Sequence, residues 1–395
     1  MTVRVNKQPF NVREKLSELE RPVGVKGHEL MRAETAQEAR DLVSAGRKNM
    51  VINGDMRIFQ RNNSGNVPNT GTYYLDRFQL RENSEGVLYA TQQTSSTGGP
   101  PGFRSWLLAQ CDGADTTVDS SNYVRIQQYI EGYNCFMDWG LPDGNTDYIT
   151  ASFWVKSNKT GVYCFQIEDG DALPLYCQEY TIEESDVWQK IVLTIPPPPE
   201  GTWRGADNGI GARLTWTLMA GAGHPTTANV WQTSYGMRTD NQVNFMDNAN
   251  NNFYLTGVQL EVGKTATDFE YRTYAEELAL CQRYFYINGG PEHDIISQAF
   301  SPHTTEIAIA WPHPTEMRAV PTVTVSSTNN NNTDFYFRTI NNTGFALTGN
   351  GRSVAQMTKH HASIWFNAMS GVPAVPGQVR VQAGRTAFIH LSAEL

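Results

Sequence analysis

Aromatic residues that fall outside regular strand patterns are the side chains of this sequence best suited to bind a ligand. A flat ring can stack on the C–H face of a pyranose, and neighbouring planar polar side chains can hold the sugar hydroxyls. For each tryptophan the alternative is a place in a hydrophobic core. The residues predicted to bind a ligand are Trp139, Trp203, Trp231, Tyr235 and Trp365.

No catalytic motif accompanies these aromatic residues. The sequence contains no GxSxG nucleophile elbow, no P-loop and no dinucleotide-binding GxGxxG. A glycosidase needs two carboxylates across a cleft, and the acidic residues are spread along the chain without a pairing pattern. We therefore predict a protein that is not an enzyme and that has no cofactor.

Possible metal ligands are also poorly arranged. The segment EDGDAL, residues 168–173, places three carboxylates around Gly170, a spacing that calcium could use. It lacks the twelve-residue EF-hand pattern, so a solvated hairpin turn is the favoured interpretation. The five cysteines form no CxxC pair, and His360 and His361 would point to opposite faces of a strand. We predict no metal site.

Charge and composition limit the class of partner. The net charge of −9 argues against nucleic acid as the main partner. No apolar run is long enough to span a bilayer, so membrane insertion is not expected. The odd number and wide spacing of the cysteines predict free thiols in a protein assembled in a reducing cytoplasm.

Three charged residues stand within otherwise apolar segments: Glu261, Arg57 and Arg77. A charge buried in a sandwich must be paired. We predict that Glu261 pairs with Arg57 or Arg77 as a structural contact.

Alternation of apolar and polar residues predicts many short strands. Turn residues separate them, and charged residues make up only 18% of the chain, which favours a sandwich or jelly roll over long helices. Within 253–262 one face is predicted to carry Tyr254, Thr256, Val258, Leu260 and Val262. Strands are predicted at residues 73–80, 123–130, 148–156, 161–167, 188–195, 213–219 and 253–262.

The period changes to that of a helix after Thr273, where Tyr274, Leu278 and Cys281 recur at helical spacing. A smaller set of strands is predicted after this helix. The predicted fold is therefore mainly β. It comprises a short helical N-terminal arm (1–48), a jelly-roll-like β-sandwich (49–272), one linking helix (273–286) and a smaller C-terminal β domain (287–395).

The first 48 residues carry apolar side chains at helical spacing. Helices this short are marginal alone. A frayed tail is one interpretation. We favour an arm that becomes ordered when its apolar residues are buried on another subunit. The residues predicted to make this attachment are Phe10, Val12, Leu16, Leu19, Leu42 and Val43.

Three separated segments occur in a recognisable order: NMVINGDMRIFQR at 49–61, YYLDRFQL at 73–80 and FYLTGVQLEVGKTATDFEYRTYAEELALCQRYF at 253–285. Together they resemble a carbohydrate-binding-like β-sandwich module of bacteriophage virion appendages, especially tail-fibre proteins. The resemblance implies a structural protein of a tailed bacteriophage. It further implies a homotrimeric tail fibre that is attached to the tail hub or adaptor by its N-terminal arm and that contributes to recognition of a host surface glycan or receptor.

Two alternatives stay open. A capsid decoration or head-fibre protein would share the module and bind the shell through its arm. A polysaccharide-cleaving, tailspike-like enzyme is the other, although the chain is short for a β-helical spike and lacks repeat periodicity. The expected location is the virion, on the tail or, in the first alternative, on the capsid surface.

Overall fold

A computed structural model gives the fold, which is mainly β. The six residues predicted to make the attachment lie outside the described part of the chain. Across the described residues, no helix is both long and apolar enough to cross a bilayer. All five cysteines are buried with free thiols. The structure describes residues 48–62, 64–69, 71–139, 147–170, 173–199, 203, 207–290, 293–303, 306–327, 335–347, 352–367 and 373–395.

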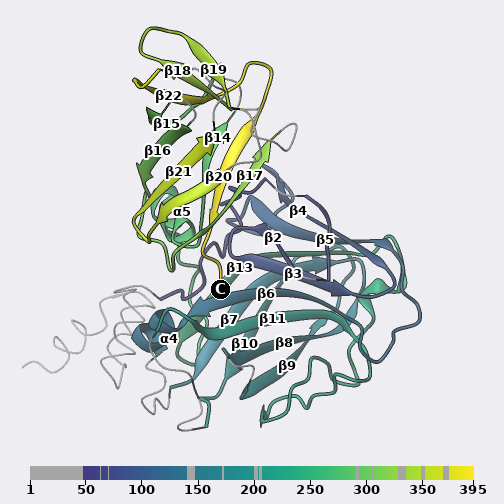
Figure 1. Cartoon of the computed structure of the whole chain (residues 1–395). Coiled ribbons are helices and arrows are strands. Elements are labelled where there is room, and N and C mark those ends of the chain that lie inside the picture. The colour runs from purple at the N-terminus through teal and green to yellow at the C-terminus, as the bar shows by residue number, and fades with distance from the viewer. Residues whose placement is uncertain are drawn as a thin grey trace, which may run out of the picture. The chain divides into compact units, whose positions relative to one another are not determined.

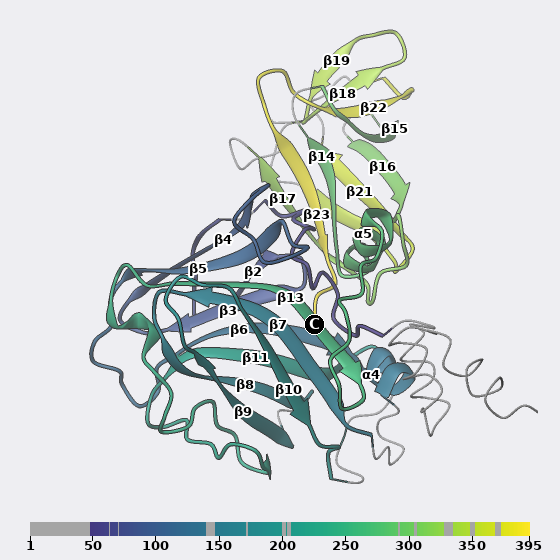
Figure 2. The same ribbon diagram turned by 180° about the vertical axis from the view of Figure 1, so that it is seen from behind.

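Two antiparallel sheets form a sandwich from strands within residues 65–262 (Figure 1; seen from behind in Figure 2). The first sheet has the strand order β1 (Gly65–Asn66), β4 (Val87–Thr94), β5 (Ser105–Gly113), β13 (Asn252–Val262), β7 (Ile149–Ser157) and β10 (Gln189–Ile195). The second sheet has the order β12 (Trp231–Gln232), β9 (Leu175–Ile182), β8 (Gly161–Asp169), β11 (Ile210–Ala220), β6 (Tyr123–Glu131), β3 (Phe78–Asn83) and β2 (Thr72–Leu75).

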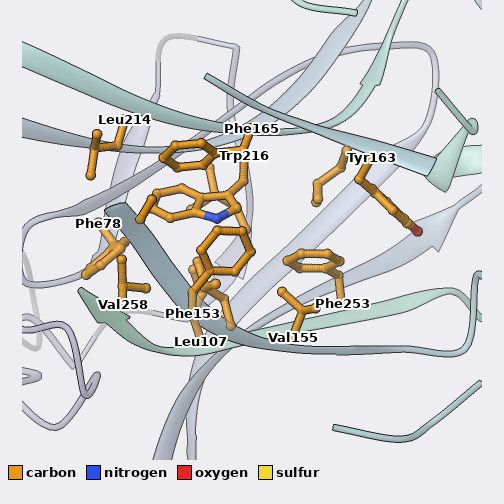
Figure 3. Packing of buried hydrophobic residues seen from close by; sticks show 14 of the residues in the cluster. Phe78, Leu107, Phe153, Val155, Tyr163, Phe165, Leu214, Trp216, Phe253 and Val258 are labelled. Atoms are coloured by element: carbon orange, nitrogen blue, oxygen red, sulfur yellow. The ribbon is translucent and has the colours of Figure 1, made fainter. Parts of the chain in front are cut away.

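The core between these sheets is built around Trp216 of β11, which is fully buried. Its ring meets Phe153 of the first sheet at a centroid distance of 5.6 Å and Phe165 of β8 at 5.1 Å, both edge to face. Figure 3 shows these rings among Phe78, Leu107 and Val258, which come from both sheets. The alternating apolar residues of the predicted strands therefore meet in one core.

The faces predicted for the strand at 253–262 are wrong in part. Phe253 and Leu255 are buried in the same core as Val258 and Leu260, although simple alternation placed them on opposite faces. Between them Gly257 has φ +62, and the pairing of β13 with β7 shifts register between Thr256 and Gln259. The extra residue of this bulge reverses the inward and outward positions.

The segment predicted as a single strand at 73–80 is a hairpin. Strands β2 and β3 pair with each other, and the chain turns at Asp76 and Arg77, where Arg77 has φ +72. Alternation alone does not reveal this turn.

The opening segment, residues 48–62, contains no strand and is held by asparagine side chains. Asn49 donates from Nδ2 to the carbonyl of Val258 (3.1 Å) and accepts from the backbone N–H of Leu260 (3.1 Å). A Cβ on Gly54 would lie 2.1 Å from the carbonyl oxygen of Val258, so only glycine fits there. The NGD turn therefore packs directly on the closing strand of the sandwich.

The predicted pairing of Glu261 with an arginine is wrong. Glu261 accepts hydrogen bonds from Gln259 and from the backbone and hydroxyl of Thr267, so its charge is satisfied locally. Arg57 pairs with Asp55 at 2.9 Å. Arg77, which is almost fully buried, pairs with Glu394 from the far end of the chain.

A second group of strands follows the short helix α5 (Tyr274–Gln282). Thr273 and Glu276 form a capping box at its first turn. These strands enclose a separate apolar core that includes Phe335, Phe337 and Leu391. They form a three-stranded sheet of β14 (Phe285–Gly290), β23 (Ala387–Ser392) and β17 (Thr322–Ser327). They also form a seven-stranded sheet of β19 (Gly344–Ala346), β18 (Phe335–Thr339), β22 (Pro376–Val381), β15 (Ile295–His303), β16 (Glu306–Pro312), β21 (His361–Asn367) and β20 (Arg352–Met357).

Buried ion pairs join the sandwich to residues that follow it. Glu394 accepts from Arg61 at 2.7 Å and from Arg77. Glu131, at the end of β6, accepts from Arg283 at 2.6 Å and from the hydroxyl of Tyr284 at 2.7 Å. These carboxylates are almost inaccessible to water, so each depends on its partners for its charge to be tolerated.

Removing one partner of the buried Arg77–Glu394 ion pair should therefore lower the stability of the fold. Glu394→Ala leaves the Arg77 guanidinium buried without its carboxylate, and we expect a loss of about 3–5 kcal/mol in the free energy of unfolding. Asp240→Ala is the matched control, because Asp240 pairs with Arg238 but is 99% exposed, and it should change little. Urea unfolding of the three proteins measures this difference, and equal stability of both variants would contradict it.

Candidate functional site

The outward side of the second sheet carries mostly polar side chains, and hydrogen bonds hold many of them in place. Strands β6, β11 and β8 direct Ile126, Trp216 and Phe165 into the core. Because side chains alternate along a strand, the residues between them point to the opposite side. We call the outward side chains of β3, β6, β11 and β8 the polar face, made of Gln79, Arg81, Arg125, Gln127, Tyr129, Arg213, Thr215, Thr217, Cys164, Gln166 and Glu168.

Strand register arranges the polar face in three rows. Rows two residues apart on a strand are separated by about 7 Å, and neighbouring strands by about 4.8 Å. Two rows run across β3, β6, β11 and β8. The first is Arg81, Arg125, Thr217 and Cys164, and the second is Gln79, Gln127, Thr215 and Gln166. The third row begins at β6 and consists of Tyr129, Arg213 and Glu168.

Hydrogen bonds fix the floor of the polar face. Gln127 donates from Nε2 to the hydroxyl of Thr215 at 3.0 Å, and that hydroxyl is 3.4 Å from Oε1 of Glu168. Nη1 of Arg213 lies 3.1 Å from the same carboxylate oxygen. Gln127 and Thr215 are fully buried and Glu168 is 2% exposed. These side chains are therefore held in place before any ligand arrives.

Residues at the edge of the floor remain reachable. The hydroxyl of Tyr129 donates to Oε1 of Gln79 at 3.2 Å, and the Arg213 guanidinium lies over the Tyr129 ring, 5.4 Å from its centroid. Gln79 and Arg213 are partly exposed, whereas Tyr129 is buried at 7% exposure beneath the guanidinium. A carboxamide and a guanidinium thus reach the surface together, and planar polar groups of this kind can hold sugar hydroxyls.

Residues 221–243 cross part of the polar face. Gln166 donates from Nε2 to the carbonyl of Gly236 at 2.8 Å, and Gln242 donates to the carbonyl of Thr217 at 3.3 Å. The Cys164 thiol lies 3.7 Å from the hydroxyl of Thr239. This cover lies over the β8 side of the two rows that contain Thr217 and Gln166, whereas Gln79 and Arg81 of β3 are partly exposed.

The same segment places Tyr235 over Arg125. Nη1 of Arg125 donates to the Tyr235 hydroxyl at 2.6 Å, and the guanidinium lies 4.8 Å from the ring centroid of Tyr123. His224 meets the rings of Tyr123 and Tyr235 edge to face. Arg125 is 6% exposed whereas Tyr235 is 39% exposed, so Tyr235 forms the surface above a buried cation.

Burial changes the acidity of two groups here. Desolvation raises the pKa of Glu168, and the nearby Arg213 and Arg125 charges partly oppose this increase. Desolvation also raises the pKa of Tyr235, opposed by Arg125, so the phenol is neutral and can accept the arginine hydrogen bond. The site therefore combines cations and neutral hydroxyls around one carboxylate.

The predicted ligand-binding aromatics are not brought together. Tyr235 joins the polar face. Trp203 is 6% exposed and donates from Nε1 to the carbonyl of Gly211 at 2.7 Å, so the structure contradicts its prediction and assigns it to the core. Trp231 is half-buried against Trp203 and donates to the carbonyl of Pro196. Trp139 ends helix α4 (Gly132–Trp139), and its side chain lies outside the described part of the structure.

Trp365 lies on the other β domain. It is half-buried on β21, paired across β16 with Ala308, which in turn is paired with Phe300 of β15. Phe300 is 54% exposed. The role predicted for Trp365 stays a prediction.

Sequence reasoning missed the central residues of the polar face, among them Tyr129, Gln79 and Arg213. The available signal was the alternation in 123–130, where tyrosine, arginine and glutamine alternate with core residues. Such polar positions on a half-buried strand are usually solvated, and only the register shows that three strands align theirs. Among the described residues, no group of three or more His, Cys, Asp or Glu is placed to hold a metal ion.

Comparisons with known proteins find similarity only among solved structures. No protein-family model and no curated protein matches the sequence. The enzymatically active domain of tailspike protein 4 of bacteriophage CBA120 is 12% identical with a TM-score of 0.30, and the match covers 54% of this chain and 21% of that chain.

Two carbohydrate-binding modules are also similar. The family 11 module of Clostridium thermocellum, in complex with a mixed-linked tetrasaccharide, is 12% identical with a TM-score of 0.27 over 52% of this chain and 98% of that chain. TmCBM61, in complex with β-1,4-galactotriose, is 9% identical with a TM-score of 0.27, and the match covers 55% of this chain and 99% of that chain. Similarity at this level leaves the function to be inferred from the side chains of this chain.

Proposed function

We propose that the polar face binds a glycan and that the chain is a structural appendage protein of a tailed bacteriophage. The observation that carries glycan binding is the placement of the partly exposed Gln79 and Arg213 beside a floor of buried, hydrogen-bonded polar groups. The carboxamide and the guanidinium can take adjacent sugar hydroxyls. Fixed donors and acceptors reduce the entropy lost on binding.

Binding without cleavage fits the charges of the polar face. Hydrolysis of a glycosidic bond usually requires two carboxylates about 5–10 Å apart. Glu168, the carboxylate in the floor of the polar face, already pairs with Arg213. The outward carboxylate of the neighbouring β9, Glu179, accepts a hydrogen bond from Asn241. We therefore propose recognition of a host surface glycan and not its hydrolysis.

The virion role rests on the three segments that resemble phage appendage proteins. Two of them meet in the fold, since the NGD turn at 53–55 packs on Val258 of the closing strand. A homotrimeric tail fibre, attached by residues 1–48 to the tail hub or adaptor, is the form proposed here. A capsid decoration protein with the same module is the competing placement.

Glycan binding is tested by calorimetric titration with polysaccharide from the host surface. Gln79→Ala should weaken binding about tenfold, or about 1.4 kcal/mol, because a carboxamide that takes sugar hydroxyls is lost. The control is Tyr274→Ala, which removes a tyrosine that is 59% exposed on helix α5. Unchanged affinity in Gln79→Ala, with the control also unchanged, would remove the polar face from the binding site.

The virion placement is tested on whole particles and on purified protein. Immunogold electron microscopy with antibody to residues 287–395 should label the tail, and sedimentation equilibrium should give about three times the 44.1 kDa of one chain. Label spread over the capsid would replace the tail-fibre role with the decoration role, and a monomeric mass would exclude the trimer.

A further inference from the structure

The seven-stranded sheet of the C-terminal β domain carries two outward aromatic side chains in one row. Strands β15, β16 and β21 are neighbours in this sheet (Figure 1). Register pairs Phe300 of β15 with Ala308 of β16, and Ala308 with Trp365 of β21. The residue before each of the three is buried in the core, so their own side chains point to the opposite side of the sheet. We call Phe300, Ala308 and Trp365 the aromatic row.

The two rings of the aromatic row are accessible and stand apart. Neighbouring strands are about 4.8 Å apart, so the positions of Phe300 and Trp365 are separated by about 9.6 Å. Phe300 is 54% exposed and Trp365 is partly exposed, and within the described ranges neither ring contacts another ring or a cation. Ala308, between them, contributes only a methyl group. One pyranose is too small to cover both rings, so each ring can stack on a different unit of one sugar chain.

Accessible polar groups lie on both sides of the aromatic row. Gln298 is two residues before Phe300 on β15, and Glu306 is two residues before Ala308 on β16. Because β15 and β16 are antiparallel, these side chains fall on opposite sides of the row. Gln298 is exposed, Glu306 is partly exposed, and neither side chain has a hydrogen-bond or ion-pair partner among the described residues. A carboxamide and a carboxylate can therefore take hydroxyls from either edge of a bound sugar.

Glu306 is also the charged residue nearest to the two rings by register. It is diagonal to Phe300 across β15 and to Trp365 across β21, positions about 7–8 Å apart. The other charged side chains that register places on this face are Arg338 and Arg380, on β18 and β22, farther from the rings. A carboxylate beside both rings accepts hydroxyl hydrogen bonds and repels an acidic sugar.

The width of the aromatic row favours a sugar chain over the surface of another protein chain. A stable protein interface buries about 800 Å² on each partner and is depleted of charged residues at its core. The aromatic row is only one side chain wide, since Glu306 lies on one side of it and a mostly polar row lies on the other. That second row consists of Ser363, Ala310, Gln298, Gln378 and Arg338.

We propose that the aromatic row is a second sugar-binding site, which takes a neutral oligosaccharide with one unit on Trp365 and another on Phe300. Glu306 and Gln298 hold hydroxyls at the two edges of that sugar chain. The site lies on the C-terminal β domain and shares no residue with the polar face, so neither site needs the other.

The test is an array of neutral oligosaccharides, their monosaccharides and carboxylated oligosaccharides, probed with full-length Gln79→Ala protein so that the polar face contributes less. Neutral oligosaccharides should bind at least about tenfold more tightly than either other set. In the same background Phe300→Ala and Trp365→Ala should each weaken this binding about tenfold, because a stacking ring is lost. Glu306→Gln should reduce the discrimination against carboxylated members, an effect that a merely structural residue would not produce.

The control is Ile340→Ala, which truncates a 70% exposed apolar side chain just after β18 and should leave affinity within about twofold. Binding that Phe300→Ala and Trp365→Ala leave unchanged, while Gln79→Ala weakens it, overturns the second site and keeps the polar face. Binding to no member of the array removes both sites. Sedimentation equilibrium is the second readout: a lower mass for Phe300→Ala than for wild-type protein would make this face a contact between copies of the chain and overturn the proposal.

Discussion

Alternation along β6, β11 and β8 is the constraint on which this structure depends. The residues of these strands that point inward surround Trp216 and hold the two sheets of the sandwich together (Figure 3). The residues between them must then point outward, and most of them are glutamine, threonine, arginine or glutamate. The same three strands therefore determine both the hydrophobic core and the polar face, and a shift of one residue would exchange them.

The outward residues are buried as well as polar, so each must be satisfied. Gln127, Thr215, Glu168 and Arg213 satisfy one another, and residues 221–243 cover Gln166 and Thr217. A network of this kind is rigid because every bond that breaks leaves a buried group unpaired. Rigidity is useful in a binding surface, since a ligand then meets side chains already in position. Nε of Arg125, Nε of Arg213 and the Thr217 hydroxyl are exceptions, since they have no hydrogen-bond partner among the described residues.

Much of the fold could be predicted from the sequence, and the failures have physical causes. Local alternation located the strands around 123–130, 161–167 and 213–219, and the helical period located α5. Alternation failed at Gly257, because a bulge there reverses the inward and outward positions within β13. The partner of Arg77 could not be predicted, since Glu394 lies 317 residues away in the chain and no local pattern connects them.

The candidate site was harder to predict than the fold. Aromatic residues outside regular strand patterns included Tyr235, which lies at the polar face, but also Trp203, which is buried in the core. Tyr129 was overlooked because one tyrosine in an alternating strand is unremarkable until register places Arg213 beside it. Sites on a sheet face depend on which strands are neighbours, and strand order is a long-range property.

A crystal structure of the full chain with a host-surface oligosaccharide that it binds would test the central claim most directly. The predicted result is a sugar on the polar face, with hydroxyls bonded to Gln79 and Arg213. A sugar bound elsewhere, for instance beside Trp365 on β21 while the polar face remains empty, would contradict it.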